Sequence, residues 1–164
     1  MSDHACSACY ETPFGGVLIA SEGDFITRIA FVAQPVRTQA DAPSELTDEA
    51  AKQMREYFSG ERKGFDLPLN PQGTAFQRRV WDCLIKIPYG QTRSYKEVAA
   101  DAGNPNACRA VGMANNRNPL PIVIPCHRVV GADGALTGYA FGLQMKRRLL
   151  ELEQSGTESR SGDS

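Results

Sequence analysis

The chain has 164 residues, of which 41% are hydrophobic and 23% charged, and its net charge is −1. No apolar run approaches the ~20 residues of a membrane helix, and the first residues, MSDHACSACYETPFGG, lack the basic and apolar regions of a signal peptide. Five cysteines at irregular spacing argue against a disulfide framework, so we expect a soluble, cytoplasmic protein of one or two domains with reduced thiols.

The first half of the chain predicts a small α/β unit. Its N-terminus carries a CxxC at Cys6 and Cys9 with His4 nearby, but no fourth ligand completes a zinc site. We therefore expect an irregular N-terminus with two exposed thiols and no metal. Two strands follow, because GGVLIAS and FITRIAF are rich in β-branched and aromatic residues and EGD provides a hairpin turn between them.

A polar, proline-containing connector leads to a predicted helix over SELTDEAAKQMREYFSGERKG. Thr47 is the expected N-cap and Gly60 the stop. Apolar residues recur at helical spacing at Ala51, Met54, Tyr57 and Phe58. Residues 1–70 form the predicted N-terminal domain, and LPLNPQG forms the linker that follows.

The second half begins with a predicted helix over TAFQRRVWDCLI, one face of which carries Phe76, Val80, Trp81, Leu84 and Ile85. A second, short helix starts at SYKEV, where Ser94 and Glu97 have the spacing of a capping box. After the turn NPN, the stretch ACRAVGMANN predicts a third short helix. The last two of these helices, joined by a tight turn, predict a helix-turn-helix.

The residues after this motif predict an extended segment over NPLPIVIP, then Cys126, then a hairpin at GADG. The stretch LQMKRRLLELEQ predicts a closing helix. The polar composition of residues 155–164 predicts a disordered tail.

Charge is distributed unevenly along the chain. The balance is −5 over residues 1–76, +7 over residues 77–150 and −3 over residues 151–164. The basic middle segment holds the predicted helix-turn-helix and indicates an anionic partner, with nucleic acid the leading candidate. The alternative is a solvated basic face with no such partner.

Cys126 lies in the run IPCHRVV, beside one of the two histidines of the chain and next to an arginine. A free cysteine is usually a small buried hydrophobe, and a single Cys–His pair is poor material for a zinc site. The apolar neighbours predict burial, yet a buried base and a buried cation destabilise a fold unless each has a partner. Cys126 is therefore a candidate nucleophile with His127 as its base. A cysteine hydrolase is the chemical alternative.

From about Tyr10 to Glu153 the chain resembles the O6-alkylguanine-DNA alkyltransferase family, the methylated-DNA–protein-cysteine methyltransferases. The resemblance is carried by GTAFQRRVW, IPYGQTRSY, RAVGMANNRNPLPIVIPCHRVV, TGYAFG and KRRLLELE. It implies an α+β fold with an N-terminal α/β domain of ribonuclease-H-like topology and a C-terminal winged-helix, helix-turn-helix DNA-binding domain over residues 71–154. It also implies single-turnover, irreversible transfer of the alkyl group of O6-alkylguanine, and of O4-alkylthymine, to a cysteine, without cofactor or metal.

The resemblance implies that Cys126 attacks the alkyl carbon and keeps the group as a thioether. His127 would draw the thiol proton through a bridging water, while Glu153 would hold the imidazole. Asn118 would link the second helix of the helix-turn-helix, the recognition helix, to the loop that carries Cys126. From the residues alone, Glu153 would be an exposed charge on the last helix, and Asn118 would be a turn residue before a proline.

The remaining implied roles concern DNA. Tyr95 would donate its hydroxyl to the flipped guanine, and Arg109 would fill the gap left in the duplex, with its helix in the minor groove. Extrusion is necessary because a base inside the stack is out of reach of a buried cysteine. Phe141 stands where many members have glycine, so the ring should restrict bulky alkyl groups. Contacts to the base or the DNA are also implied for Ala110, Val129, Tyr139 and Ala140.

The partner implied is double-stranded alkylated DNA, bound through its minor groove by a monomer away from any membrane. An alkyltransferase-like lesion binder is the alternative among binding proteins. Those relatives usually have tryptophan in place of the cysteine, whereas Cys126 is present here.

Overall fold

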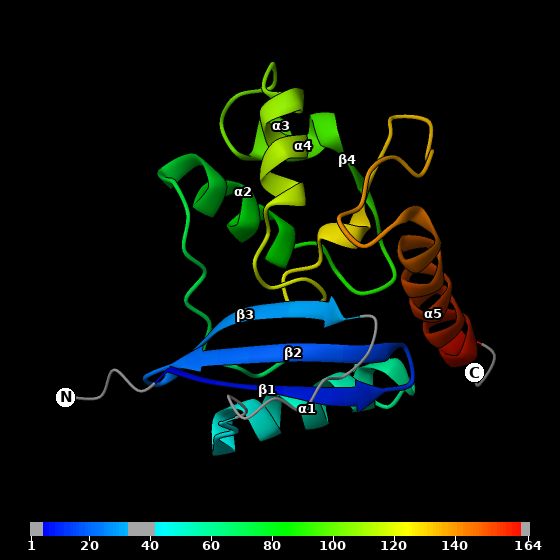
Figure 1. Ribbon diagram of the computed structural model, residues 1–164. Coiled ribbons are helices and arrows are strands. Elements are labelled where there is room, and N and C mark those ends of the chain that lie inside the picture. Colours follow the sequence, from blue (N-terminus) through cyan, green and yellow to red (C-terminus); the bar gives the residue numbers. More distant parts are fainter. Residues whose placement is uncertain (1–4, 33–41, 162–164) are drawn as a thin grey trace. The chain divides into compact units, whose positions relative to one another are not determined.

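The computed structural model of the protein describes residues 5–32 and 42–161 (Figure 1). The chain divides into two compact units, Met1–Gln72 and Gly73–Ser164, where the sequence predicted a boundary at residue 70. Both combine helices with short sheets, which makes the fold α+β. Within 5–32 and 42–161, no helix is long and apolar enough to cross a membrane.

The first unit is built on a three-stranded antiparallel sheet of β1 (Ala5–Thr12), β2 (Gly15–Glu22) and β3 (Phe25–Val32), in that order. The predicted β2–β3 hairpin is confirmed. The prediction of an irregular N-terminus is wrong, because β1 pairs with β2 along its whole length.

The CxxC lies within β1, and its two thiols are half-buried rather than exposed. Residues three positions apart on a strand point to opposite faces. Cys6 and Cys9 therefore do not face a common ion. His4 lies outside the described residues.

Helix α1 (Glu45–Phe58) packs against the strands of this sheet (Figure 1). All four apolar residues predicted to share a face are buried: Ala51, Met54, Tyr57 and Phe58. The predicted cap is wrong by three residues. Ser44 is the N-cap, and its hydroxyl accepts a hydrogen bond from the backbone N–H of Thr47 at 3.1 Å. The Thr47 hydroxyl accepts from the Ser44 backbone N–H at 2.8 Å, so Thr47 takes the place usually held by Glu or Gln in a capping box.

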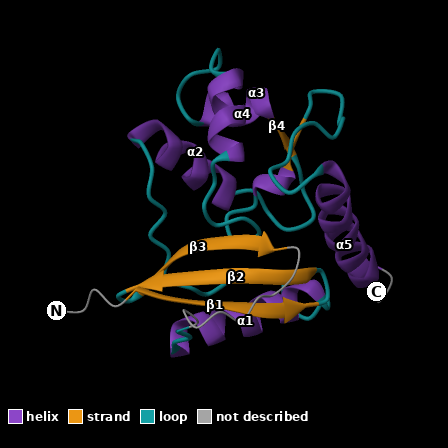
Figure 2. Cartoon of the chain, viewed as in Figure 1, coloured by secondary structure: helices purple, strands orange, loops and turns teal. Residues whose placement is uncertain are grey.

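The second unit consists mainly of short helices. Its elements in chain order are α2 (Ala75–Ile85), β4 (Arg93–Ser94), α3 (Tyr95–Asp101), α4 (Cys108–Asn116), the single 3₁₀ turn η1 (Cys126–Arg128), β5 (Val129–Val130) and α5 (Leu143–Ser161). Strands β4 and β5 pair in parallel. Between α4 and α5 the chain is mostly loop (Figure 2).

The predicted helix-turn-helix is confirmed as α3 and α4, which pack against each other. The capping box of α3 joins Ser94 and Glu97 as predicted. Helix α2 supports α4 through the indole N–H of Trp81, which donates to the Ala114 carbonyl at 2.9 Å in a buried position. One predicted core residue of α2 is misplaced, since Ile85 is 49% exposed.

Two further predictions for this unit are corrected. The GADG stretch forms a turn, closed by a hydrogen bond from the Gly131 N–H to the Ala135 carbonyl, but no second strand follows to complete a hairpin. Helix α5 continues to Ser161, so the predicted tail is helical up to that residue. Packing explains the extension: a Cβ at Gly156 would lie 2.7 Å from the Tyr89 hydroxyl, so this turn of α5 lies directly against the loop after α2.

Candidate active site

The loop before Cys126 is held in an unusual conformation by its own polar groups. Asn118 spans it, donating from Nδ2 to the Ile124 carbonyl at 2.8 Å and accepting at Oδ1 from the Leu120 N–H at 2.9 Å. Ile122 is buried with φ at +75°, the one non-glycine residue with positive φ in the described ranges. Since a β-branched residue strongly disfavours this region, the loop carries local backbone strain.

Cys126 lies at the start of η1, directly after Pro125, and is 4% exposed. The Asn115 side chain on α4 donates to its carbonyl at 3.1 Å, which links the helix-turn-helix to the backbone of this residue. Burial raises the pKa of the Cys126 thiol to about 11, although Asn118, Lys146 and Tyr139 each act to lower it. The 3₁₀ turn places Cys126 outside any regular strand.

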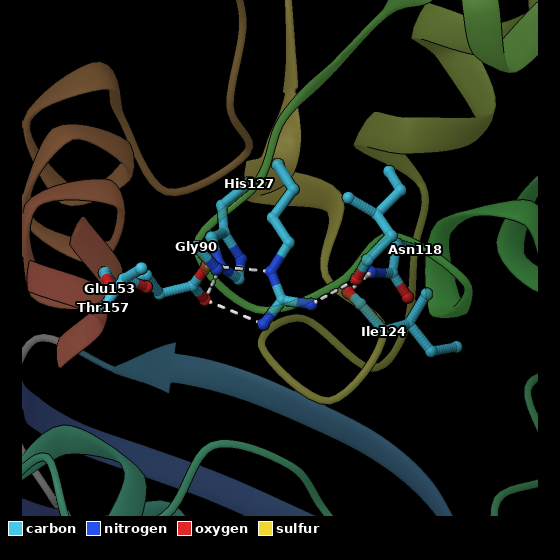
Figure 3. Close-up of polar contacts among 8 residues, drawn as sticks. Gly90, Asn118, Ile124, His127, Glu153 and Thr157 are labelled. Carbon is cyan, nitrogen blue, oxygen red and sulfur yellow. Dashed lines mark hydrogen bonds and ion pairs between the residues drawn. The ribbon is translucent and has the colours of Figure 1, made fainter. Parts of the chain in front are cut away.

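His127 is the second residue of η1 and is fully buried. Its Nε2 lies 2.6 Å from Oε2 of Glu153, whose side chain reaches it from α5 (Figure 3). Glu153 is 1% exposed, so the interpretation of this residue as a surface charge, drawn from the residues alone, is wrong. The structure thus brings together two residues that are 26 positions apart in the sequence.

Arg128 completes the group, and the sequence reasoning did not assign it a role. Its Nε donates to Oε1 of Glu153 at 2.8 Å and its Nη2 donates to Oε2 at 2.9 Å. The third nitrogen, Nη1, donates to the Ile87 carbonyl at 2.7 Å. The Gly90 N–H adds a further bond to Oε1 at 3.1 Å. The buried base and the buried cation of IPCHRVV therefore share a single carboxylate as their partner.

The electrostatics of this cluster follow from its hydrogen bonds. Burial alone would raise the pKa of Glu153, but the bonds from His127 and Arg128 overcome it and hold the pKa at about 2. Glu153 is therefore ionised at all ordinary pH values. Burial lowers the pKa of His127, and the attraction of Glu153 offsets this only in part.

Lys146 is a second site residue that the sequence reasoning missed. It lies on α5, fully buried, and its Nζ donates to the Thr137 carbonyl at 2.9 Å and the Gly138 carbonyl at 3.2 Å. Burial lowers the pKa of Lys146 to about 8, while the nearby Cys126 acts to raise it. The only signal in the sequence was its place at the head of the basic run KRR, which looks like an ordinary helix surface.

Tyr95, at the start of α3, lines a shallow depression of about 320 Å³. Its hydroxyl donates to the Thr137 carbonyl at 2.8 Å, so Tyr95 and Lys146 share one acceptor. The other residues around the depression come from α4 and from the loop before α5: Cys108, Arg109, Gly112, Asn116, Thr137 and Gly138.

The outer face of α4 is the exposed surface of the helix-turn-helix. Arg109, Ala110 and Asn116 are exposed there, together with Met113 at 61%, and the C-cap residue Arg117 is also exposed. The small residues Ala110 and Gly112 leave the backbone of α4 accessible to a close partner. The two guanidinium groups make this surface suitable for an anionic partner.

The remaining predicted residues lie around the cysteine turn. Val129 is buried in β5, Ala140 is exposed, and Phe141 is half-buried with its ring centroid 5.9 Å from that of Tyr139. The Tyr139 hydroxyl is buried, and it lowers the pKa of the Cys126 thiol. Over residues 5–32 and 42–161, His, Cys, Asp and Glu form no group that would hold a metal ion.

Most of the chain matches known protein families. Residues 6–71 match the model described as 6-O-methylguanine DNA methyltransferase, ribonuclease-like domain, and residues 75–155 match 6-O-methylguanine DNA methyltransferase, DNA binding domain. A methylated-DNA–protein-cysteine methyltransferase of Methanosarcina acetivorans is 47% identical over 90% of this chain and 97% of its own length. The constitutive enzyme of that name from Bacillus subtilis is 48% identical over 88% of this chain and 92% of its own.

Solved structures show the same likeness. The crystal structure of Mycobacterium tuberculosis OGT in complex with DNA has a TM-score of 0.84 and 45% identity, covering 92% of this chain and 93% of that one. The crystal structure of the O6-methylguanine methyltransferase of the same organism gives 0.83 and 43%, covering 93% and 94%.

Proposed function

This chain belongs to the 6-O-methylguanine DNA methyltransferase family, and we propose that it repairs DNA by moving the alkyl group from O6 of guanine to Cys126. The activity is that of a methylated-DNA–protein-cysteine methyltransferase. One observation carries the choice of acceptor: Cys126 heads the buried turn whose next residue, His127, is fixed by Glu153. Cys83 and Cys108 have no neighbouring histidine in the sequence.

A base is needed because the thiol is a poor nucleophile at rest. With a pKa of about 11, Cys126 is almost entirely protonated at neutral pH. The thiolate is the reactive species. We assign His127 as the group that takes the proton, through a water between the imidazole and the thiol, with Glu153 holding the ring in place.

The transfer forms one bond and breaks one. The Cys126 sulfur attacks the alkyl carbon, the new S–C bond forms, and the C–O6 bond breaks with its electron pair passing to the guanine. The departing base takes up a proton in exchange for the one lost by the thiol. Tyr95 would donate its hydroxyl to the base and stabilise the charge that develops there. To do so it must leave the Thr137 carbonyl, which Lys146 still holds.

The surface around this site would contact the DNA. Double-stranded alkylated DNA would meet α4 through its minor groove, with Arg109 filling the space of the flipped nucleotide. Ala110 would contact the groove floor, and the base would lie against Val129, Tyr139, Ala140 and Phe141. We propose that the protein acts as a monomer in the cytoplasm, where thiols stay reduced.

The product thioether has no acyl or phosphoryl centre for water to attack, so each chain accepts one alkyl group. Titrating excess duplex that contains O6-methylguanine, with chelator present, should give a plateau near one equivalent and a methylated peptide around Cys126. Cys126→Ala should bind the duplex without accepting the group. Continued turnover would indicate a true catalyst, such as a thiol hydrolase, and binding without transfer by the unaltered protein would indicate a lesion binder.

A further inference from the structure

Two side chains, His127 and Arg128, share the carboxylate of Glu153, and Arg128 has no role in the proposed reaction so far. His127 approaches a single oxygen of the carboxylate, whereas Arg128 contacts both, at 2.8 and 2.9 Å. A bidentate guanidinium–carboxylate pair is among the strongest polar contacts in proteins, and its two bonds fix the plane of the carboxylate. The direction from which His127 meets Oε2 therefore depends on Arg128.

Arg128 is held by more than the carboxylate. Its Nη1 donates to the Ile87 carbonyl at 2.7 Å, and its guanidinium carbon lies 5.7 Å from the centre of the Tyr89 ring. Only arginine offers three donors in one plane together with a face that stacks on an aromatic ring. Lysine at this position would keep the charge but lose most of these contacts.

The charges around His127 decide its protonation at rest. Glu153 and Lys146 face it from α5, Arg128 belongs to its own turn, and Cys126 precedes it. Tyr89 completes the group beside Glu153 and Arg128. Beside an unshared buried carboxylate, an imidazole would hold a proton firmly and fail as a base. Sharing that carboxylate with a fixed guanidinium removes much of the attraction.

We propose that Arg128 is a positioning residue that neutralises and orients Glu153, and so keeps the His127 imidazole neutral and ready to accept the thiol proton. This inference rests on the proposed role of His127 as the base. Arg128 touches neither the thiol nor the DNA in this assignment, and it acts on His127 through Glu153 and through its own nearby charge. The electrostatic effect of Arg128 on His127 has the required direction, since it lowers the pKa of the imidazole.

The chain has only two histidines, so the titration of His127 can be followed directly by NMR of labelled imidazoles. His4→Gln identifies the other signal. In a Cys126→Ala background, which removes the reaction, Arg128→Met should raise the titration midpoint of His127 by about one pH unit or more. Arg147→Met removes an exposed arginine from α5 and serves as the matched control, with no shift expected.

A second readout uses single-turnover transfer from free O6-methylguanine, which needs no DNA contact. Arg128→Met should slow transfer about tenfold near pH 6 and recover most of that loss as the pH rises above the new midpoint. If Arg128→Met does not fold, Arg128→Gln keeps one amide donor for the carboxylate and makes the same test. A uniform loss at every pH with an unchanged His127 midpoint would overturn the inference and leave Arg128 a purely structural residue. The proposed function fails separately, if the unaltered protein accepts no alkyl group at Cys126.

Discussion

Lys146 is fully buried in the active site, although an ammonium group is strongly hydrated in water. Two backbone carbonyls, those of Thr137 and Gly138, replace part of that water. Its pKa of about 8 means that the charge is present at neutral pH and lost in mildly alkaline solution. In its charged form it favours the thiolate of Cys126. One side chain therefore both holds the loop after the cysteine and promotes ionisation of the thiol.

Lys146→Met should separate these two effects through their pH dependence. The cation that favours the thiolate exists below about pH 8, so the loss of rate with free O6-methylguanine should be greatest there, on the order of tenfold. Above that pH the unaltered protein loses the same charge, and the two rates should converge. Lys96→Met, at an exposed position of α3, is the control. A constant ratio of rates across the pH range would mean that the hydrogen bonds matter and the charge does not.

At the scale of elements, the two faces of α4 have different roles. The outer face carries Arg109, and Arg117 at the C-cap is exposed as well. On the buried face, the Asn115 side chain donates to the Cys126 carbonyl. The helix proposed to meet the DNA is thus bonded to the backbone of Cys126, the proposed acceptor. Small displacements of α4 on the duplex would be felt directly at the thiol.

Arg109→Ala should slow repair of O6-methylguanine in a duplex by about tenfold or more, because flipping a base costs a few kcal/mol of stacking that the inserted side chain offsets. Reaction with the free base should be nearly unaffected. Arg117→Ala removes an equal charge at the C-cap of the same helix and should weaken duplex binding without this selectivity. Equal losses on both substrates would show that Arg109 does not support extrusion.

Local patterns were sufficient to predict the β2–β3 hairpin, α1 to α4 and the capping box of α3. Strand β1 was missed because ACSACYET has no clear alternation, and its pairing with β2 is what orders it. The extra turns of α5 were missed for a similar reason, since they depend on contact with the loop after α2. Tertiary contacts outweighed propensity in both segments.

The site was predictable only in part, because its key contacts are distant in the sequence. Cys126 and His127 were candidates from one short run, but the bond from His127 to Glu153 joins residues 26 positions apart. The same holds for Arg128, which reaches Ile87 across 41 positions. The need for a buried partner was clear from the residues. Its identity came from the resemblance for His127 and from the structure for Arg128.

At the scale of the molecule, net charge is a poor guide to its interactions. The total of −1 combines −5, +7 and −3 in successive segments, and the basic segment contains the helix-turn-helix. A phosphate backbone would meet that segment, while the acidic parts contribute repulsion. DNA binding should therefore depend on ionic strength much more strongly than the net charge of −1 would suggest.

The affinity of Cys126→Ala for alkylated duplex should fall steeply with salt. With three phosphate contacts, raising the salt from about 50 to about 200 mM would weaken binding about 40-fold. Changing the sequence around the lesion should have a much smaller effect, because the proposed contacts are to phosphates and to the flipped base. Fluorescence anisotropy over a salt series gives the slope directly. A slope near zero would exclude phosphates as the main partners of the basic segment.

The positive φ of Ile122 has a consequence for protein engineering. A left-handed isoleucine costs about 1–3 kcal/mol, so this position is an obvious target for anyone who wants a more heat-resistant repair protein. Glycine there would relax the backbone, but it would also remove a buried side chain four residues before Cys126. Any gain in heat resistance would be obtained by changing the loop that carries Cys126. A more flexible backbone there would position the thiol less well and reduce activity. Thermostable variants are better sought on the outer surface of α1 or in the loops of the first unit, which leave that loop as it is.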